Sequence, residues 1–211
     1  VSVLESTYFL AIDLLKSVSK NKRNFKTLFG GVFATYASDK IIHNELVDYV
    51  CRGEGEGAVV EMCKKLCSGE RIDDIKNFTI KEDGKILRNG MRPPIDINEV
   101  PIPDWDLFEP GSLYRPMQGK IWRAVGLETQ RGCPYTCTFC NSPSNNVEYK
   151  AETGGRFHRK KSIERMRKEL DFLVKKYDPN LIYFVVDTFL AMSNREFDEL
   201  KELYSDYKIP F

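Results

Sequence analysis

The sequence lacks a net charge of either sign, a long apolar run and a secretory signal. Its 32 lysines and arginines nearly balance 31 aspartates and glutamates, so the formal net charge is +1. The chain therefore has no global field that would favour nucleic acid or an anionic membrane. No apolar run reaches the roughly 20 residues that a membrane-spanning helix needs. We therefore expect a cytoplasmic protein with neither a nucleic-acid partner nor a membrane partner.

What is present is the composition of a soluble globular protein. Hydrophobic residues make up 42% and charged residues 30% of the 211 positions. This composition is enough for a real core in one large domain or two modest ones. Residue 1 is valine rather than methionine, and both ends resemble interrupted strands. We therefore expect an internal fragment of a longer protein, inactive when isolated.

Three of the six cysteines, Cys133, Cys137 and Cys140, follow Gly132 with the spacing C-x3-C-x2-C. Such clustering indicates metal binding rather than a disulfide framework. A single zinc ion would want a fourth protein ligand, and no obvious one is nearby. Three thiolates suit a cubane iron–sulfur cluster with one iron left open. The alternative is a non-catalytic protein with a structural zinc, or with a cluster that only carries electrons.

The stretch from residue 128 to residue 143 resembles the cysteine motif of radical S-adenosylmethionine enzymes. The resemblance implies that Cys133, Cys137 and Cys140 ligate a [4Fe–4S] cluster, whose fourth iron binds the amine and carboxylate of S-adenosylmethionine. It also implies reductive cleavage of that cofactor to a 5′-deoxyadenosyl radical, with flavodoxin or ferredoxin as the electron donor. Phe139 stands where this family keeps an aromatic or large apolar residue beside the adenine.

A second part of the S-adenosylmethionine site is expected at the end of an apolar run. Residues 181–186 are all apolar, which predicts a parallel strand that is covered on both faces. Asp187 and Thr188 follow, where the best-known relatives hold the cofactor's amine with a Gly-Gly-Glu element. The resemblance implies that Asp187 and Thr188 bind S-adenosylmethionine. Helix capping or a place at the rim of the core is the alternative.

The amino-terminal part of the chain alternates strand-like and helical patterns. Strands are predicted at residues 1–4, 25–29 and 47–51, and a short helical stretch at residues 40–46. This alternation predicts a parallel sheet with right-handed crossovers. Ligands of such sheets bind beyond the carboxyl ends of the strands. The loops expected there are residues 2–4, 30–31 and 53–57.

These loops resemble the S-x-L and G-G elements of cobalamin-binding domains, in which the serine lies beside the nucleotide tail and the glycines leave room for it. The resemblance implies that cobalamin is a second cofactor, bound by Ser2, Leu4, Gly30, Gly31, Gly53 and Glu54. The family's upstream D-x-H-x-x-G element, whose histidine can ligate cobalt, has no match in this chain. The alternative is an ordinary flavodoxin-like sheet whose glycines only make tight turns.

A proline-rich connector separates the two halves of the chain. Six of the ten prolines lie between Pro93 and Pro116, and proline removes amide donors and stops helices. We therefore expect an extended segment that packs against the domains, similar to the P-x-P-D-W connectors of the resembled family. Just before it, two strand-like runs flank Asp83-Gly84 and predict a hairpin. The predicted organisation is a cobalamin-binding-like domain at residues 1–88, a connector at 89–119 and a radical S-adenosylmethionine core at 120–211.

The second domain opens with a strand predicted at residues 121–127, which leads into the cysteines. A polar loop is predicted at residues 150–161 and a helix at residues 162–177, capped by Ser162. Ser193 and Glu196 form a capping box that opens a further helix. The order resembles the first third of a partial β/α (TIM-like) barrel. The predicted fold class is α/β: the last part of a Rossmann-like (flavodoxin-like) domain, then the first part of a radical S-adenosylmethionine barrel.

Apolar residues at i, i+3, i+4 and i+7 predict the buried face of each longer helix. The predicted faces are Ala11, Leu14, Leu15 and Val18; Val59, Met62, Cys63 and Leu66; Ile163, Met166, Leu170, Leu173, Val174 and Tyr177; and Phe197, Leu200, Tyr204 and Tyr207. We accordingly interpret Cys51, Cys63 and Cys67 as core residues rather than as a second metal site.

The two implied cofactors together suggest a reaction. In the resembled family a corrinoid over the barrel mouth hands a methyl group to a substrate radical. The resemblance therefore favours methyl transfer to an unactivated carbon of a small molecule. Relatives with the same layout perform ring formation or rearrangement, which is the alternative. Fold and cofactors do not identify the substrate.

Overall fold

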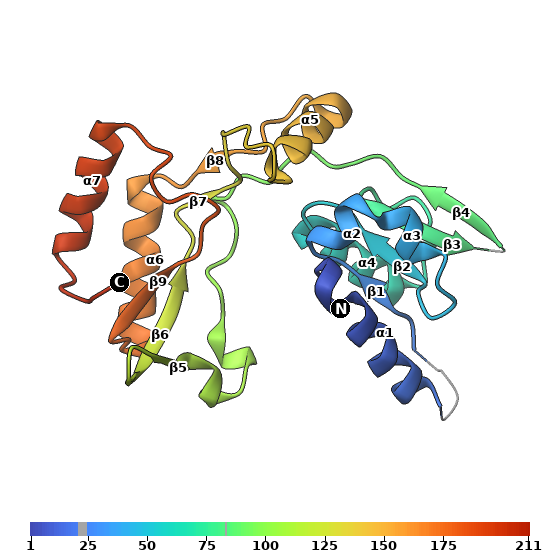
Figure 1. Cartoon of the computed structure of the whole chain (residues 1–211), viewed down its shortest axis with the longest axis horizontal. Coiled ribbons are helices and arrows are strands. Elements are labelled where there is room, and N and C mark those ends of the chain that lie inside the picture. Colours follow the sequence, from blue (N-terminus) through green and yellow to red (C-terminus); the bar gives the residue numbers. More distant parts are fainter. Residues whose placement is uncertain (21–24, 83) are drawn as a thin grey trace. The chain divides into compact units, whose positions relative to one another are not determined.

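The computed structural model describes residues 1–20, 25–82 and 84–211 and divides the chain into two compact units (Figure 1). The first unit is Val1–Pro94 with Glu152–Gly154, and the second is Ile95–Ala151 with Gly155–Phe211. Both units mix helices and strands, which confirms the α/β class. The predicted domain bounds at residues 88 and 120 stay predictions.

The first unit contains one four-stranded sheet. Its strands, in spatial order, are β1 (Leu28–Phe29), β2 (Tyr49–Cys51), β3 (Phe78–Glu82) and β4 (Lys85–Arg88). β1 and β2 pair in parallel, as predicted, and β3 and β4 form the predicted antiparallel hairpin. Asp83 of the hairpin turn lies outside the described residues. A parallel bridge joins Ser2 to Gly30, so the segment predicted as the first strand also lies beside β1.

Helices cover both faces of this sheet. They are α1 (Glu5–Ser19), α2 (Val32–Tyr36), α3 (Ser38–Ile42) and α4 (Glu56–Ser68). Phe29 and Val50 share one core cluster with residues of α1, α2 and α3, whereas Tyr49 and Cys51 share another with residues of α4. Tyr49, Val50 and Cys51 divide between the two clusters because successive side chains of a strand point to opposite faces of the sheet. The short helix predicted at residues 40–46 both begins and ends earlier, at Ser38 and Ile42, and α2 was not predicted.

The buried face of α1 differs from the prediction. Tyr8, Ala11, Ile12 and Leu15 are its buried residues, whereas Leu14 is 59% exposed and Val18 61% exposed. Both sets have helical spacing, because α1 is apolar on two sides. Spacing alone cannot choose between two such faces.

The predicted face of α4 is also confirmed only in part, by Met62. Ala58 and Met62 are buried, but Val59 is 37% and Leu66 54% exposed. Cys63 and Cys67, which we expected in the core, are exposed, whereas Cys51 is buried as predicted. Ala58 and Met62 are one turn apart, so only a narrow stripe of α4 is covered.

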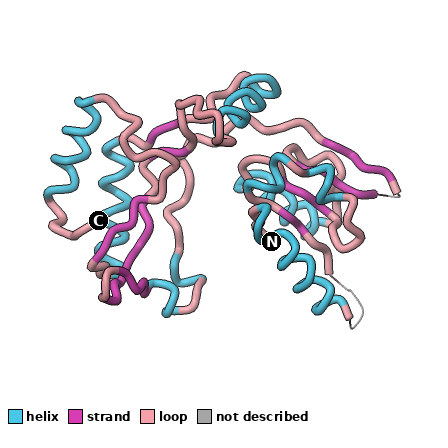
Figure 2. Tube along the Cα trace, in the orientation of Figure 1, coloured by secondary structure: helices cyan, strands magenta, loops and turns pink. Residues whose placement is uncertain are grey.

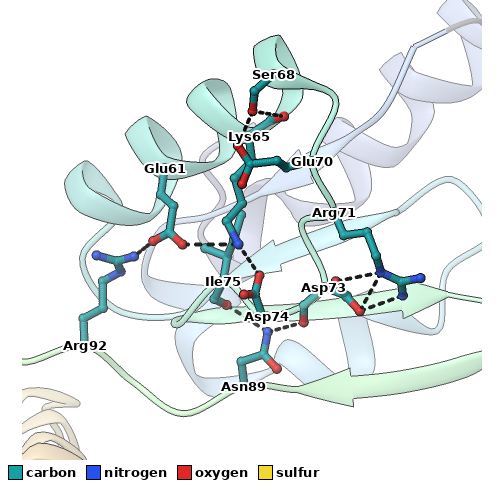
Figure 3. Close-up of polar contacts among 10 residues, drawn as sticks. All are labelled: Glu61, Lys65, Ser68, Glu70, Arg71, Asp73, Asp74, Ile75, Asn89 and Arg92. Carbon is teal, nitrogen blue, oxygen red and sulfur yellow. Dashed lines mark hydrogen bonds and ion pairs between the residues drawn. The ribbon is translucent and has the colours of Figure 1, made fainter.

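Polar contacts fasten the carboxyl end of α4 to the segment that follows it (Figure 3). Lys65 lies 2.5 Å from Asp74 and 3.8 Å from Glu61. Asn89 donates from its carboxamide to the carbonyls of Asp73 (2.7 Å) and Ile75 (2.9 Å). Contacts between exposed charges contribute little stability each. Together these bonds hold residues 73–75, which lead to Asn77, and the Asn77 side chain in turn donates to Glu54 O.

The second unit contains a three-stranded sheet and a two-stranded one. The larger has the order β5 (Tyr114–Met117), β6 (Lys120–Leu127) and β9 (Leu181–Phe184), and the smaller pairs β7 (Gln130–Arg131) with β8 (Arg159–Lys160). β6 and β9 pair in parallel, and β5 pairs antiparallel with β6. Val125, Leu127 and Ile182 form one core cluster with residues of the helices α6 (Ile163–Tyr177) and α7 (Asn194–Ser205).

The ends of α6 and α7 confirm the predicted signals. The Ser162 hydroxyl accepts from the N–H of Arg165 at 3.1 Å, and Asp178 ends α6 in a left-handed conformation (φ 43°). Ser193 and Glu196 form the predicted capping box of α7. The buried face of α6 includes Met166, Leu170, Leu173 and Tyr177, as predicted, whereas Ile163 and Val174 are partly buried.

Other expectations for the second unit need correction. The strand β9 is not covered on both faces, because Tyr183 is 47% exposed. On α7, Phe197 is 42% exposed and Leu203 is buried in its place. Helix α5 (Ser142–Thr153) occupies part of the predicted polar loop. Its residues after Ser142 are largely polar and form no apolar stripe, which explains why it was missed.

The connector packs on the second unit. Between residues 89 and 104 the described chain forms neither helix nor strand (Figure 2). The 3-10 helices η1 (Trp105–Leu107) and η2 (Pro110–Leu113) follow. Ile102 and Trp105 join the core of the second unit, and the backbone N–H of Trp105 donates to the hydroxyl of Tyr177 at 3.0 Å. The predicted packing of the connector against a domain is thus confirmed for these residues. Among the helices described, none combines the length and apolar character needed to cross a membrane.

Candidate functional site

The chain brings together two of the three loops predicted at the strand ends of the first unit. The N–H of Val3 donates to Gly30 O at 2.9 Å, and the N–H of Gly30 donates to Val1 O at 2.8 Å. Gly31 has φ +93°, and a Cβ atom there would lie 2.7 Å from the Ser2 hydroxyl oxygen. A side chain at residue 31 therefore has neither the space nor the conformation it needs. At Gly30, in contrast, a Cβ atom would meet nothing within 4 Å.

Thr35 on α2 links the third loop to the other two. The N–H of Gly53 donates to the Thr35 hydroxyl oxygen at 3.0 Å, and that hydroxyl donates to Gly31 O at 3.3 Å. Thr35 is buried, and its hydroxyl connects the loop that follows β1 to the loop that follows β2. Sequence reasoning missed Thr35 because its partner Gly53 is 18 residues away.

Asn77 holds the next residue of the third loop. It is 1% exposed, with a left-handed backbone (φ 75°). Its carboxamide donates to Glu54 O at 2.7 Å and accepts from the N–H of Arg92 at 2.6 Å. Leu4, also predicted to bind cobalamin, is 54% exposed and precedes α1 as its N-cap. The glycine loops, defined here as residues 2–4, 30–31 and 53–54, are thus organised by main-chain and buried side-chain bonds.

A buried ion pair lies just before the third loop. Arg52 is 1% exposed, and its guanidinium donates to the Glu152 carboxylate at 3.1 Å and to Asn89 O at 2.8 Å. Burial opposes ionisation of Glu152, but the hydrogen bonds from Arg52 and from the N–H of Met91 outweigh it and lower the pKa of Glu152. A buried arginine needs such a partner, because an unpaired buried charge is costly.

The three clustered cysteines lie on one loop after β6 and β7. This cysteine loop is defined as residues 133–140. Gly132 begins it with φ +80°, and a Cβ atom at this position would lie 2.7 Å from Phe157 O, so only glycine fits. Cys133 is half-buried, whereas Cys137 and Cys140 are exposed, and Phe139 is 93% exposed.

The three thiols do not converge on one point. Within residues 1–20, 25–82 and 84–211, no three His, Cys, Asp or Glu side chains lie close enough together to hold a metal ion. The assignment of Cys133, Cys137 and Cys140 as ligands therefore stays a prediction. It depends on the donor set, three soft thiols on one short loop, which fits an iron–sulfur cluster.

The amino terminus of α5 stabilises the ends of the cysteine loop. The side-chain amide of Asn146 donates to Cys133 O at 2.9 Å, and the N–H of Ser142 donates to Cys140 Sγ at 3.4 Å. The bonds from Ser142 lower the pKa of the Cys140 thiol, and the positive end of the helix acts in the same direction. The thiolate is the form that binds metals, so the local field favours ligation.

Asp187 and Thr188 follow β9, next to the strand that leads to the cysteine loop. The N–H of Val185 donates to Leu127 O at 2.9 Å, which extends the parallel pairing of β6 and β9 to this point. The Asp187 carboxylate opposes the lowering of the Cys140 pKa, so the two groups interact electrostatically. The fold therefore brings these predicted residues to one end of the sheet. Their role in binding stays a prediction.

Several curated proteins resemble the chain in sequence. It is 30% identical over 200 residues to an uncharacterized methyltransferase of Pyrococcus horikoshii, which covers 94% of this chain and 41% of that protein. It is 29% identical over 164 residues to the hopanoid C-3 methylase of Methylococcus capsulatus, covering 75% and 28%. It is 30% identical over 118 residues to the anaerobic magnesium-protoporphyrin IX monomethyl ester cyclase of Synechocystis sp., covering 56% and 23%. The chain thus spans less than half the length of these relatives, and no family model matches it.

Solved structures share its fold. The cobalamin-dependent S-adenosylmethionine radical enzyme OxsB, with aqua-cobalamin and S-adenosylmethionine bound, matches 98% of this chain with a TM-score of 0.69 at 22% identity; the match covers 28% of that protein. The radical S-adenosylmethionine methyltransferase TsrM of Kitasatospora setae matches 92% of this chain and 34% of its own, with a TM-score of 0.57 at 16% identity. The chain belongs to the radical S-adenosylmethionine proteins that carry a cobalamin-binding domain.

Proposed function

We propose that this chain is part of a cobalamin-dependent radical S-adenosylmethionine enzyme that transfers a methyl group to an unactivated carbon of a small molecule. The observation that carries the proposal is the position of the cysteine loop. It follows β6 and β7, and Asp187 and Thr188 follow β9, the parallel neighbour of β6. Reactive groups of β/α barrels lie at this end of the parallel strands.

In this proposal Cys133, Cys137 and Cys140 hold a [4Fe–4S] cluster. Phe139, Asp187 and Thr188 bind S-adenosylmethionine. When bound, the cluster supplies the electron that cleaves S-adenosylmethionine, and flavodoxin or ferredoxin is the proposed donor of that electron. The chain's own contribution is to leave Cys137 and Cys140 exposed and to lower the pKa of the Cys140 thiol through the hydrogen bonds from Ser142 at the amino terminus of α5.

Cobalamin is the proposed second cofactor, held by the glycine loops through Ser2, Leu4, Gly30, Gly31, Gly53 and Glu54. Two observations support it. Gly31 packs directly against Ser2, and the position of a Cβ atom at Gly30 is open. The first unit is then proposed to be the last part of a Rossmann-like domain, and the second unit the first part of a radical S-adenosylmethionine barrel.

Methyl transfer is favoured because three of the matched proteins are named as methyltransferase or methylase, and two of these matches cover 94% of this chain. A second candidate is ring formation, because three of the matched proteins are anaerobic magnesium-protoporphyrin IX monomethyl ester cyclases, at 25–30% identity. The substrate is proposed to be a small molecule in either case.

The test uses the full-length protein, reconstituted without oxygen and supplied with a reductant and S-adenosylmethionine. We expect bound iron and sulfide, formation of 5′-deoxyadenosine, and cobalamin absorbance that stays with the protein through gel filtration. Without 5′-deoxyadenosine the radical proposal is wrong. Zinc in place of iron and sulfide would instead identify a structural metal site.

A pair of cysteine variants tests the ligand assignment. Cys137→Ala should lose the cluster, whereas Cys63→Ala should retain it, because Cys63 lies on the exposed face of α4 in the other unit. Iron content per chain and the visible absorbance of the cluster measure the difference. Cluster loss in Cys63→Ala with retention in Cys137→Ala would reverse the assignment.

A further inference from the structure

Gln130 connects the strand before the cysteine loop to the segment after β9. It lies on β7, two residues before Gly132, and is only 2% exposed. Its carboxamide nitrogen donates to the carbonyl of Thr188 and, at 3.3 Å, to that of Phe189. Its carboxamide oxygen accepts from Nε2 of His158 at 3.1 Å. One buried side chain thus joins three segments of the second unit.

These bonds are directional and depend on the amide group. The two partners after β9 are carbonyl oxygens, which accept only, so they need the two N–H donors of the carboxamide. The partner on the other side is a ring nitrogen that donates to the amide oxygen. A buried polar group without partners is costly, so this arrangement specifies glutamine rather than a side chain of similar volume.

The hydrogen bonds of Gln130 connect the chain beyond the point at which the pairing of β6 and β9 ends. Parallel pairing of β6 and β9 runs from Ala124 and Leu181 to Leu127 and Phe184, with one more bond from the N–H of Val185 to Leu127 O. Beyond this point β6 is followed by β7 and the cysteine loop, whereas β9 is followed by the segment of residues 187–189. The Gln130 carboxamide holds that segment to β7, across 58 residues of sequence.

We propose that Gln130 is a positioning residue, which holds the backbone of residues 187–189 beside the cysteine loop so that Asp187 and Thr188 are in place for S-adenosylmethionine. This role depends on the proposed function above. Asp187 and Thr188 lie within this segment, so a shift of its backbone would displace both side chains. Gln130 itself makes no contact with cofactor in this proposal.

The test compares Gln130→Leu and Gln130→Glu with the wild type in full-length, anaerobically reconstituted protein. Gln130→Glu keeps the shape and the acceptor for His158 but replaces the two N–H donors by an oxygen that faces two carbonyls. We expect both variants to keep the iron content of the wild type and to bind S-adenosylmethionine about tenfold more weakly, because each loses buried side-chain hydrogen bonds. Equilibrium dialysis gives the dissociation constant, and the electron paramagnetic resonance spectrum of the reduced cluster should shift less on cofactor addition.

Asn180→Leu is the matched control. Asn180 lies just before the start of β9, at the end opposite Asp187, and its carboxamide oxygen accepts from the N–H of Arg123 at 2.7 Å. This variant loses an amide-to-backbone bond in the same unit, so it should lower the melting temperature while leaving the dissociation constant unchanged.

The outcomes separate the two proposals. If wild-type protein binds S-adenosylmethionine and Gln130→Glu binds it equally well, the role of Gln130 is refuted and the proposed function stands. Equal weakening in Asn180→Leu also refutes it, because the effect would then be general destabilisation. If wild-type protein carries a cluster but binds no S-adenosylmethionine, the proposed function fails and the role of Gln130 fails with it.

Discussion

The glycine loops of the first unit and the cysteine loop of the second unit are built in different ways. The glycine loops are fixed by the chain itself, through the close approach of Gly31 to Ser2 and the buried side chains of Thr35 and Asn77. The cysteine loop is fixed at its two ends, and between them Phe139 is 93% exposed. The glycine loops are thus defined by their backbone conformation, whereas the cysteine loop is defined by the chemistry of its side chains.

This difference separates the expected effects of mutation. Substitutions that disturb the glycine loops should lower the stability of the fold, because these loops share hydrogen bonds with the buried side chains of Thr35 and Asn77. Substitutions within the cysteine loop should change metal binding while leaving the fold intact.

The largest effect is expected for Gly31→Ala. The added Cβ atom would lie 2.7 Å from the Ser2 hydroxyl oxygen and 2.9 Å from Val3 N, in a backbone with φ +93°. We expect the free energy of unfolding to fall by about 3 kcal/mol, from backbone strain and overpacking together. Urea unfolding followed by circular dichroism measures it.

Gly30→Ala is the control for this substitution. Its Cβ atom would meet nothing within 4 Å, so stability should change by less than about 0.5 kcal/mol. If cobalamin binds here as proposed, the same variant should weaken cobalamin binding while remaining folded. Equal destabilisation by Gly30→Ala and Gly31→Ala would contradict the description of the glycine loops.

The sequence predicted some elements well because their signals are local. Ser162 and Asp178 determine the ends of α6, and the capping box of Ser193 and Glu196 determines the start of α7. The buried face of α1 was predicted correctly for Ala11 and Leu15 but wrongly for Leu14 and Val18, because two apolar faces with the same spacing compete on one helix. Helix α5 carried no apolar stripe that could be recognised.

A smaller effect is expected for Thr35→Val, which keeps the shape and removes the hydroxyl. The N–H of Gly53 would lose its acceptor, and Gly31 O would lose a donor. Unfolding free energy should fall by about 1–2 kcal/mol, the cost of leaving a buried group unpaired. Urea unfolding again measures the change.

Thr79→Val is the matched control on β3. Thr79 is fully buried, and its hydroxyl has no hydrogen-bond partner among the described residues. Removing that hydroxyl should leave stability unchanged within about 0.5 kcal/mol, or raise it slightly. A larger loss in Thr79→Val than in Thr35→Val would mean that the Thr35 bonds do not stabilise the glycine loops.

The sites were predicted only as far as residue types and short spacings reach. The cysteine spacing and the paired glycines are visible in the sequence, and the fold brings Ser2 beside Gly31. Thr35 and Gln130 were missed because their bonds join residues 18 and 58 positions apart. Such pairs carry no local signal, since only the folded chain brings them together.

The smallest effect is expected for Glu196→Gln, which tests whether the scaffold around the cysteine loop depends on charge. The hydrogen bond from Lys160, with those from the N–H and hydroxyl of Ser193, lowers the pKa of Glu196 to about 2. A lowered carboxyl pKa contributes stability above the unfolded value of about 4.3. That contribution is lost as the pH falls toward 2. Because the side chain is 42% exposed, we expect a loss of less than about 1 kcal/mol at pH 7.

The measurement is urea unfolding of wild type and Glu196→Gln at several pH values. The difference between them should be greatest near pH 7 and should narrow between about pH 4 and pH 2, as the wild-type carboxylate becomes protonated. Glu199→Gln on the same helix is the control, because its partner Arg195 is 87% exposed and the pair should contribute almost nothing at any pH. A pH-independent difference for Glu196→Gln would show that capping geometry rather than charge stabilises this end of α7. The second unit would then resemble the first, with a scaffold held by backbone bonds.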